Sequence, residues 1–225
     1  MERTDWQKLI DNLQKQKVLR TPKVIAAMRN VPRTKFLPTE KQEYNSDDSP
    51  VPIGFGQTVS APHVVSVMNE ALQFDVGNKV LEVGAGSGWQ AATIAELITN
   101  KEAPRSEWGH IYAMEIVQAL AEQAKKNIMN AGYGDKVTII NGNGSKGYPE
   151  KAPFDRIVVT AAASEVPAPL FEQLKSGGIM LIPIGKASIF QNLMKITKEA
   201  DGKVNFENLG GVSFAPLTGE FGKNL

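Results

Sequence analysis

The sequence contains no cysteine, two histidines and nearly balanced charge, with 25 Lys and Arg against 24 Asp and Glu and a net charge of +1 at pH 7. The lack of cysteine excludes disulfides, a thiolate nucleophile and cysteine-ligated metal, and no motif of the HExxH kind points to a metal site. A charge near zero removes the electrostatic argument for a broad nucleic-acid or anionic-membrane surface. No apolar run approaches the ~20 residues of a membrane span, and residues 1–14 are too polar for a secretory signal. We therefore expect a cytoplasmic protein that binds neither nucleic acid, membrane nor metal.

The chain has the length of one domain, with 225 residues. Residues 2–20 and 23–29 predict two short helices, and residues 38–52 are polar and show no periodicity. From residue 60 onward, helices alternate with short apolar runs that lack a polar face, which is typical of a mostly parallel sheet covered on both sides. The expected strands are 79–83, 110–116, 136–140, 154–160, 179–184, 191–199 and 212–217, and the expected helices of this region are 60–72, 90–98, 118–129 and 166–174. The pattern predicts a doubly wound α/β fold with an N-terminal helical appendage.

A glycine-rich turn, Gly84-Ala85-Gly86-Ser87-Gly88, follows the first strand of the alternating region. An open α/β sheet binds its ligand at this place, and glycines let the backbone approach a ligand closely. The spacing is GxGxG followed by Trp89, whereas dehydrogenases need GxGxxG and phosphate-binding Walker loops need Gly-Lys-Ser/Thr. The turn therefore favours a ligand other than a dinucleotide or a nucleoside triphosphate.

Two carboxylates flank this turn. Glu82 stands two residues before the first glycine, where its charge would repel a phosphate and suit a cation. Glu115 ends the next strand, where an acid can accept hydrogen bonds from ribose hydroxyls. Its separation from Gly84 exceeds the usual ~20 residues, and a surface-loop insertion at 100–109 accounts for the excess. Glycine turns can be purely structural and strand-end acids merely solvated, but the combination favours S-adenosylmethionine, which carries an amino group, a sulfonium and a ribose.

Six blocks of sequence carry a resemblance to one family: AAMRNVPRTKFLP (26–38), PIGFGQTVSAPH (52–63), KVLEVGAGSGWQAA (79–92), EKAPFDRIVVTAAASEVP (150–167), LKSGGIMLIPIG (174–185) and VSFAPLTGEF (212–221). On these blocks the chain resembles the protein-L-isoaspartate O-methyltransferases, which are Rossmann-like class I S-adenosylmethionine-dependent enzymes. The resemblance covers nearly the whole chain, and QTVSAPH is its most specific block. It implies methylation of the free α-carboxylate of L-isoaspartyl residues in damaged proteins and peptides, with S-adenosylhomocysteine as the second product. The methyl ester then closes to a succinimide, whose hydrolysis regenerates some normal aspartyl linkage.

The resemblance also implies roles for matching residues. Ser60 matches the active-site serine. The positions assigned to the cofactor are Thr58, Val59, His63, Glu82, Gly84, Gly86, Ser87, Gly88, Glu115, Asn143 and Gly144, and those assigned to the substrate are Ile53, Gln57, Ser60 and Thr218. We expect one methyltransferase domain, 1–225, with N-terminal helices and a substrate-side loop (1–59), a cofactor-binding core (60–190) and C-terminal strands (191–225). The polar stretch 38–52 is the expected lid or substrate-side element, and the protein is expected to be a monomer.

The reaction so implied demands little acid–base chemistry. A free α-carboxyl group has a pKa of ~3.5 and is ionised at neutral pH, so it needs no general base, covalent nucleophile or metal. The site must position the reactants in line, which can supply ~7–11 kcal/mol, and must exclude water, because opposite charges vanish as the methyl group moves. Ser60 is accordingly interpreted as a hydrogen-bond donor that orients the carboxylate. Its alternative role is to cap the helix that opens at 60–62.

Two other functions stay open on the sequence. The chain could methylate a different carboxylate acceptor, keeping the cofactor half of the site, or it could bind the cofactor or isoaspartyl peptides as a non-catalytic adaptor. A dehydrogenase is disfavoured because Trp89 replaces the third glycine of the fingerprint. Recognition of the peptide is expected to use backbone hydrogen bonds in a strand-addition mode.

Asn143 departs from the family pattern, which has aspartate between the two glycines where this chain reads Gly142-Asn143-Gly144. An amide oxygen can still accept a hydrogen bond from the adenine amino group, but without the charge that roughly doubles such a bond. We predict that Asn143→Asp binds S-adenosylmethionine more tightly than the parent chain. A binding titration of both chains tests this, and equal affinities would refute it.

Overall fold

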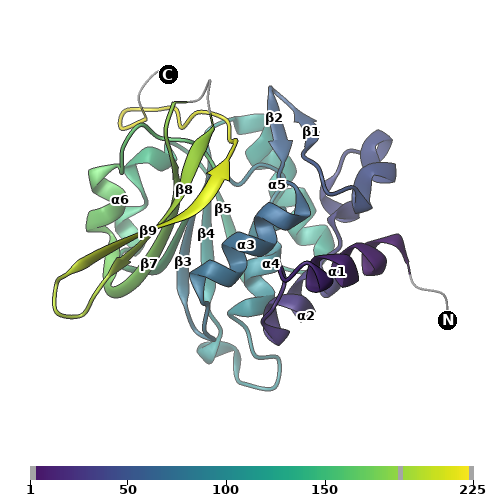
Figure 1. The fold of residues 1–225 in the computed structure, drawn as a ribbon, viewed down its shortest axis with the longest axis horizontal. Helices are drawn as coiled ribbons and strands as arrows, with labels where there is room; N and C mark the ends of the chain where they lie inside the picture. The colour runs from purple at the N-terminus through teal and green to yellow at the C-terminus, as the bar shows by residue number, and fades with distance from the viewer. Residues whose placement is uncertain (1–3, 187–189, 223–225) are drawn as a thin grey trace.

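The computed structural model describes residues 4–186 and 190–222. Within them, seven strands form one sheet in the order β5-β4-β3-β6-β7-β8-β9 (Figure 1). In chain order these strands are β3 (Lys79–Val83), β4 (His110–Glu115), β5 (Val137–Asn141), β6 (Phe154–Val159), β7 (Leu174–Ile184), β8 (Gln191–Lys198) and β9 (Val204–Val212). The strands from β3 to β7 are parallel, and β8 and β9 are antiparallel additions. The strand order reverses between β3 and β6, which is where a doubly wound sheet binds its ligand.

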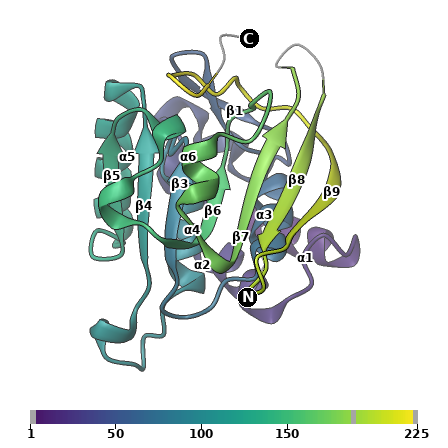
Figure 2. The ribbon, with the colours of Figure 1, turned by 90° about the vertical axis from the view of Figure 1, so that its left-hand side faces the viewer.

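Helices cover both faces of the sheet (Figures 1 and 2). They are α1 (Asp5–Lys15), α2 (Pro22–Asn30), α3 (Pro62–Leu72), α4 (Trp89–Leu97), α5 (Gln118–Ala131) and α6 (Ala168–Glu172). Alternate residues of β3 point to opposite faces: Val80 belongs to the apolar cluster formed with α1 to α5, and Leu81 to the cluster formed with α6. Both side chains are fully buried, which explains why the strand has no polar face. The predicted doubly wound α/β fold is confirmed, and none of the described helices is long and apolar enough to cross a membrane.

The N-terminal helical appendage packs on α4. Thr4 and Gln7 form a reciprocal capping box that starts α1. The buried Trp6 indole donates to the Met28 carbonyl of α2 at 2.9 Å, and its ring meets Trp89 edge to face at 6.0 Å. These contacts place α1 and α2 beside the helix that follows the glycine turn. Helix α1 is shorter than the predicted span 2–20, of which residues 2 and 3 lie outside the described residues.

The stretch 38–52 has more structure than predicted. It contains a 3₁₀ helix, η2 (Thr39–Ser46), and the start of a hairpin between β1 (Val51–Gly54) and β2 (Gln57–Val59). The hairpin strands are only four and three residues long, too short to give a strand pattern in the sequence. Its turn is Gly54-Phe55-Gly56, with φ of +92°, +54° and +70°, so the flanking glycines supply most of the left-handed backbone that the turn requires.

The predicted strand 212–217 is wrong. Strand β9 ends at Val212, and the segment 213–218 leaves the sheet and crosses the carboxyl ends of the central strands (Figures 1 and 2). It is held by one isolated bridge, in which Ala162 N donates to Ala215 O and Leu217 N donates to Ala162 O, both at 2.7 Å. Pro216 lies between these bonds and has no N–H to extend a ladder. The C-terminal part of the chain therefore reaches the ligand-binding edge of the sheet.

The remaining helices and loops lie close to the predicted bounds. The insertion 100–109 is largely exposed and contains the 3₁₀ helix η3 (Arg105–Glu107). Two further 3₁₀ helices, η4 (Gly144–Lys146) and η5 (Pro149–Lys151), follow β5, and η1 (Arg33–Phe36) follows α2. Strand β7 begins five residues earlier than the predicted strand 179–184, because Leu174 already pairs with Phe154 of β6.

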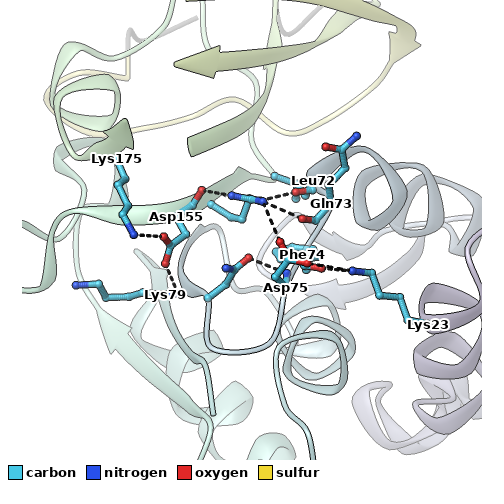
Figure 3. A network of polar contacts seen from close by, with 10 residues as sticks. Lys23, Leu72, Gln73, Phe74, Asp75, Lys79, Asp155 and Lys175 are labelled. Atoms are coloured by element: carbon cyan, nitrogen blue, oxygen red, sulfur yellow. Dashed lines mark hydrogen bonds and ion pairs between the residues drawn. The ribbon is translucent and has the colours of Figure 1, made fainter. Parts of the chain in front are cut away.

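A buried arginine of β6 holds the C-terminal end of α3, where Figure 3 shows Leu72, Gln73 and Phe74 close to Asp155. Arg156 of β6 donates to Leu72 O at 2.5 Å, Gln73 O at 2.9 Å and Asp155 O at 2.8 Å. The first two are carbonyls of the last helical turn and its cap, which the helix itself leaves without partners. Lys23 reaches the next carbonyl, that of Phe74. The end of α3 remote from the glycine turn is thus tied to the sheet and to α2.

We predict that Arg156→Met lowers the free energy of unfolding by about 2 kcal/mol, because buried carbonyls left unpaired cost ~1–3 kcal/mol each. Denaturant unfolding measures the change. Lys8→Ala is the control, since the exposed Lys8–Asp5 pair should change stability by less than ~0.5 kcal/mol. Equal stability of Arg156→Met and the parent chain would contradict the role given to Arg156.

Candidate active site

A cavity of about 330 Å³ lies at the carboxyl ends of β3, β4 and β6, at the reversal of strand order. Its size falls in the range of pockets that hold cofactor-sized ligands. The lining comes from three separate parts of the chain: Pro50, Gln57–Ala61, Val64 and Val65 on one side, Glu82–Ser87, Trp89, Gln90, Met114–Val117, Gly144, Thr160 and Ala161 at the strand ends, and Ser213–Thr218 over them. The site is therefore assembled from the N-terminal segment, the sheet edge and the C-terminal segment.

The glycine turn requires glycine for space as well as for conformation. Gly84 has a φ of +97°, and a Cβ there would lie 2.4 Å from the Thr160 hydroxyl oxygen. That hydroxyl donates to Gly84 O at 2.6 Å and ties the turn to the end of β6. Gly144, after β5, has the same constraint, because a Cβ would lie 2.6 Å from Val83 Cγ1. The packing therefore leaves no space for a side chain at either position, Gly84 being blocked by Thr160 and Gly144 by Val83.

Glu82 is a buried carboxyl group at the floor of this cavity. It is 1% exposed, and its Oε2 atom has no hydrogen-bond partner among the described residues. Burial, and secondarily repulsion from Glu115, raises the pKa of Glu82 well above its ordinary value. A carboxyl oxygen left without a partner in a dry site suits a ligand that brings N–H donors and positive charge. The residues present therefore fit a cationic ligand of the S-adenosylmethionine type.

Glu115 is held in a fixed orientation at the end of β4. Its Oε2 accepts from Gly86 N at 2.9 Å and its Oε1 from Val117 N at 3.0 Å. These two bonds link the glycine turn to the loop after β4. Each oxygen retains a further lone pair, so the carboxylate can accept hydroxyl donors from a ligand beside the turn.

Ser60 lies on the cavity, directly before α3. The helix begins at Pro62, and its cap residue is Ala61, with no side-chain capping bond. The structure therefore does not give Ser60 the capping role that the sequence left open. Its carbonyl is bound by Arg33 Nη1 at 3.2 Å, which fixes the backbone that carries the hydroxyl.

Most of the other predicted positions meet at this cavity. Gln57, Thr58 and Val59 reach it from β2, Gly84, Gly86 and Ser87 from the glycine turn, and Thr218 from the C-terminal segment. Ile53 lies beside the turn, with Cδ1 3.6 Å from where a Cβ on Gly86 would stand. Gly88 lies behind it, against Ile128 of α5. Trp89 serves both as core and as cavity wall, being 2% exposed with its indole donating to Val31 O at 2.9 Å.

Besides Gly88, two predicted cofactor positions, His63 and Asn143, do not line the cavity. His63 is exposed, and both its backbone N and its Nδ1 contact Asp48 Oδ1, at 2.8 and 2.9 Å. Asn143 caps η4, since its Oδ1 accepts from Ser145 N at 3.0 Å and from Ser145 Oγ at 2.7 Å. Gly219 packs so closely on the Asn143 amide that a Cβ would overlap it. The oxygen that we expected to accept from adenine is thus engaged within the protein.

The sequence analysis gave no role to most of the C-terminal lining. Ser213–Leu217 closes the cavity from above the strand ends, held by Ala162 and by the fully buried Gln191, whose Oε1 accepts from Phe214 N at 2.8 Å. Only the VSFAPLTGEF block hinted at this, through the resemblance. No group of three His, Asp or Glu side chains among residues 4–186 and 190–222 could hold a metal ion.

Comparison with known proteins agrees with this geometry. The family model described as "Protein-L-isoaspartate(D-aspartate) O-methyltransferase" matches residues 4–222. Relatives named protein-L-isoaspartate O-methyltransferase include one of Hyperthermus butylicus, 48% identical over 96% of this chain and 89% of its own, and one of Thermococcus sibiricus, 47% identical over 96% and 95%. A Plasmodium falciparum structure described as such an enzyme in complex with S-adenosyl-L-homocysteine superposes with a TM-score of 0.82, at 27% identity over 96% of this chain and 99% of that one. The chain belongs to the protein-L-isoaspartate(D-aspartate) O-methyltransferase family.

Proposed function

We propose that the protein transfers the methyl group of S-adenosylmethionine to the free α-carboxylate of L-isoaspartyl residues in damaged proteins and peptides. The observation that carries this is the cavity itself, because Glu82, whose Oε2 has no partner among the described residues, and Ser60 both line it. Membership of the family and the likeness to a structure solved with S-adenosyl-L-homocysteine support the same activity. The family's own name supports isoaspartyl-containing proteins as the substrates.

The cofactor side of the cavity binds through charge and close backbone approach. S-adenosylmethionine, when bound, supplies an electrophilic methyl group on a positively charged sulfur. Glu82 would accept hydrogen bonds from the ligand's N–H donors. Because the added positive charge would lower the carboxyl pKa again, its proton would pass to solvent as the ligand binds. Glu115 offers its remaining lone pairs to the ribose hydroxyls, and the backbone of Gly84, Gly86 and Gly144 lines the cavity beside them.

The acceptor side orients a carboxylate and keeps water away. Ser60 donates its hydroxyl hydrogen to the carboxylate, with Gln57 and Thr218 on the same cavity. An α-carboxyl group is already ionised at neutral pH, so no side chain has to remove a proton. The apolar lining, including Val64 and Leu217, excludes water while the opposite charges are extinguished. The methyl ester then loses methanol to the attack of the next backbone nitrogen, and the resulting succinimide hydrolyses without help from the protein.

Within one methyltransferase domain, we assign cofactor binding to the core of residues 60–190. The acceptor side combines Ser60, at the start of that core, with the substrate-side loop of residues 1–59 and with segment 213–218. The η2 segment and the loop after it form the substrate-side element, since Pro50 lines the cavity. A cytoplasmic monomer remains our expectation. Methylation of another carboxylate and non-catalytic binding are the alternative functions, and one assay separates all three.

The assay compares labelled methyl transfer to matched isoaspartyl and aspartyl peptides. We predict a base-labile methyl ester on the isoaspartyl peptide alone, and a kcat/KM lowered about ten- to hundredfold in Ser60→Ala, the range expected for one hydrogen bond to a charged group. Ser66→Ala is the matched control, because Ser66 is buried on the same helix and its hydroxyl donates to Pro62 O at 2.8 Å. Label on both peptides would favour another acceptor, and cofactor binding without label would favour an adaptor.

Glu82 also predicts a pH dependence of stability. With its pKa raised in the folded state, the native chain keeps a proton that the unfolded chain releases above ~pH 4.3. The free energy of unfolding therefore falls as pH rises from there through the raised pKa. We predict that ligand-free Glu82→Gln has a higher Tm than the parent at neutral pH and an equal Tm near pH 4. Thermal melts across this range test it, and parallel Tm profiles of the two chains would overturn the assignment.

A further inference from the structure

Arg33 is a charged side chain enclosed in the protein beside the acceptor side of the cavity. It lies on η1 and is 0% exposed. Its guanidinium donates to four backbone carbonyls: Nη1 to Ser49 O at 2.7 Å and Ser60 O at 3.2 Å, and Nη2 to Tyr44 O and Asp47 O, both at 2.7 Å. Each terminal nitrogen thus serves two carbonyls.

These carbonyls come from two places that are distant in sequence. Three of them belong to segment 44–49, which comprises the last residues of η2 and the start of the loop before β1, and the fourth belongs to Ser60. Next to this segment, Pro50 lines the cavity. Asp48 adds a second link, because its Oδ1 accepts from His63 N in the first turn of α3. Arg33 therefore links segment 44–49 to the backbone of Ser60, the proposed catalytic serine.

The planar fork of arginine is what this arrangement requires. Burial lowers the pKa of Arg33 to about 10, so the group stays charged at neutral pH, and the charge strengthens each bond to a carbonyl. Its Cζ lies 5.8 Å from the centre of the Trp89 ring, which is itself a cavity wall. A lysine ammonium carries all its donors on one nitrogen. It cannot replace two guanidinium nitrogens that each bind a separate pair of carbonyls.

Resting on the proposed function, we propose that Arg33 is a positioning residue for the acceptor half of the site: its fork sets Ser60 and segment 44–49 in register around the isoaspartyl carboxylate. The hydrogen bonds that Arg33 donates all go to the acceptor side. Glu82 and Glu115, on the cofactor side, are positioned by β3, β4 and the glycine turn instead. Loss of the fork should consequently weaken use of the peptide and spare binding of the cofactor.

The test replaces Arg33 by lysine and compares it with Arg156→Lys. Arg156 is the matched control because it too is a buried arginine that donates to backbone carbonyls, at the other end of the same helix α3 and away from the cavity. We expect Arg33→Lys to lower kcat/KM for an isoaspartyl peptide at least about tenfold, while its Kd for S-adenosylhomocysteine stays within about twofold of the parent's. Arg156→Lys should lower Tm and leave both constants within about twofold.

Hydrogen exchange measured by mass spectrometry supplies a readout that does not depend on turnover. Peptides covering 44–61 should exchange faster in Arg33→Lys than in the parent. In Arg156→Lys their exchange rate should equal that of the parent. Each of three results in Arg33→Lys would overturn the proposal. They are unchanged exchange of peptides covering 44–61, unchanged kinetics with the isoaspartyl peptide, and equal losses of peptide use and cofactor affinity. Arg33→Gln, which is neutral and cheaper to bury, replaces the lysine variant if that chain does not fold. Absence of methyl transfer by the parent chain would refute the proposed function instead, and the exchange data would still judge Arg33.

Discussion

The site depends on a carboxyl group that the protein buries without satisfying. Glu82 sits in the central strand β3, one of its oxygens has no partner among the described residues, and Glu115 lies close enough to repel its charge. Such a group is costly to bury and destabilises the ligand-free fold as pH rises. A cationic ligand with N–H donors both pairs the free carboxyl oxygen and neutralises the buried negative charge. The site therefore favours a ligand that carries positive charge.

The two halves of the cavity are built differently. Parallel strands and a glycine turn form the cofactor half, where backbone geometry leaves little freedom. The acceptor half is made of short irregular segments: a hairpin, η2 and residues 213–218. Arg33 bonds the end of η2 and both flanks of the hairpin, whereas the Ala162 backbone and the Gln191 side chain hold residues 213–218. The cofactor half is thus built on the sheet, and the acceptor half consists of segments that are held separately. This combination suits an enzyme that must accept the same carboxylate in many peptides.

Local pattern was enough to predict the parallel part of the sheet and the side chains that line the cavity where its strands end, whereas strand β9 was not predicted. Apolar runs without a polar face marked β3 to β6, and Glu82, Glu115 and the glycine turn follow directly from strand position. What the sequence could not reveal depends on distant partners. His63 is exposed and bonds Asp48, and Gly219 covers the amide of Asn143. The local sequence Val-Pro-Arg does not indicate that Arg33 will be buried among four backbone carbonyls. Residues 212–217 alternate like a strand, yet Pro216 and the bridge to Ala162 divert them over the cavity.

The most direct test of the account is a crystal structure of this chain with S-adenosylhomocysteine bound. We expect the ligand in the cavity beside the glycine turn, with its amino group satisfying Glu82 Oε2 directly or through one water and its sulfur facing Ser60. A ligand bound elsewhere, or one that leaves Glu82 Oε2 without a partner, would contradict the central claim.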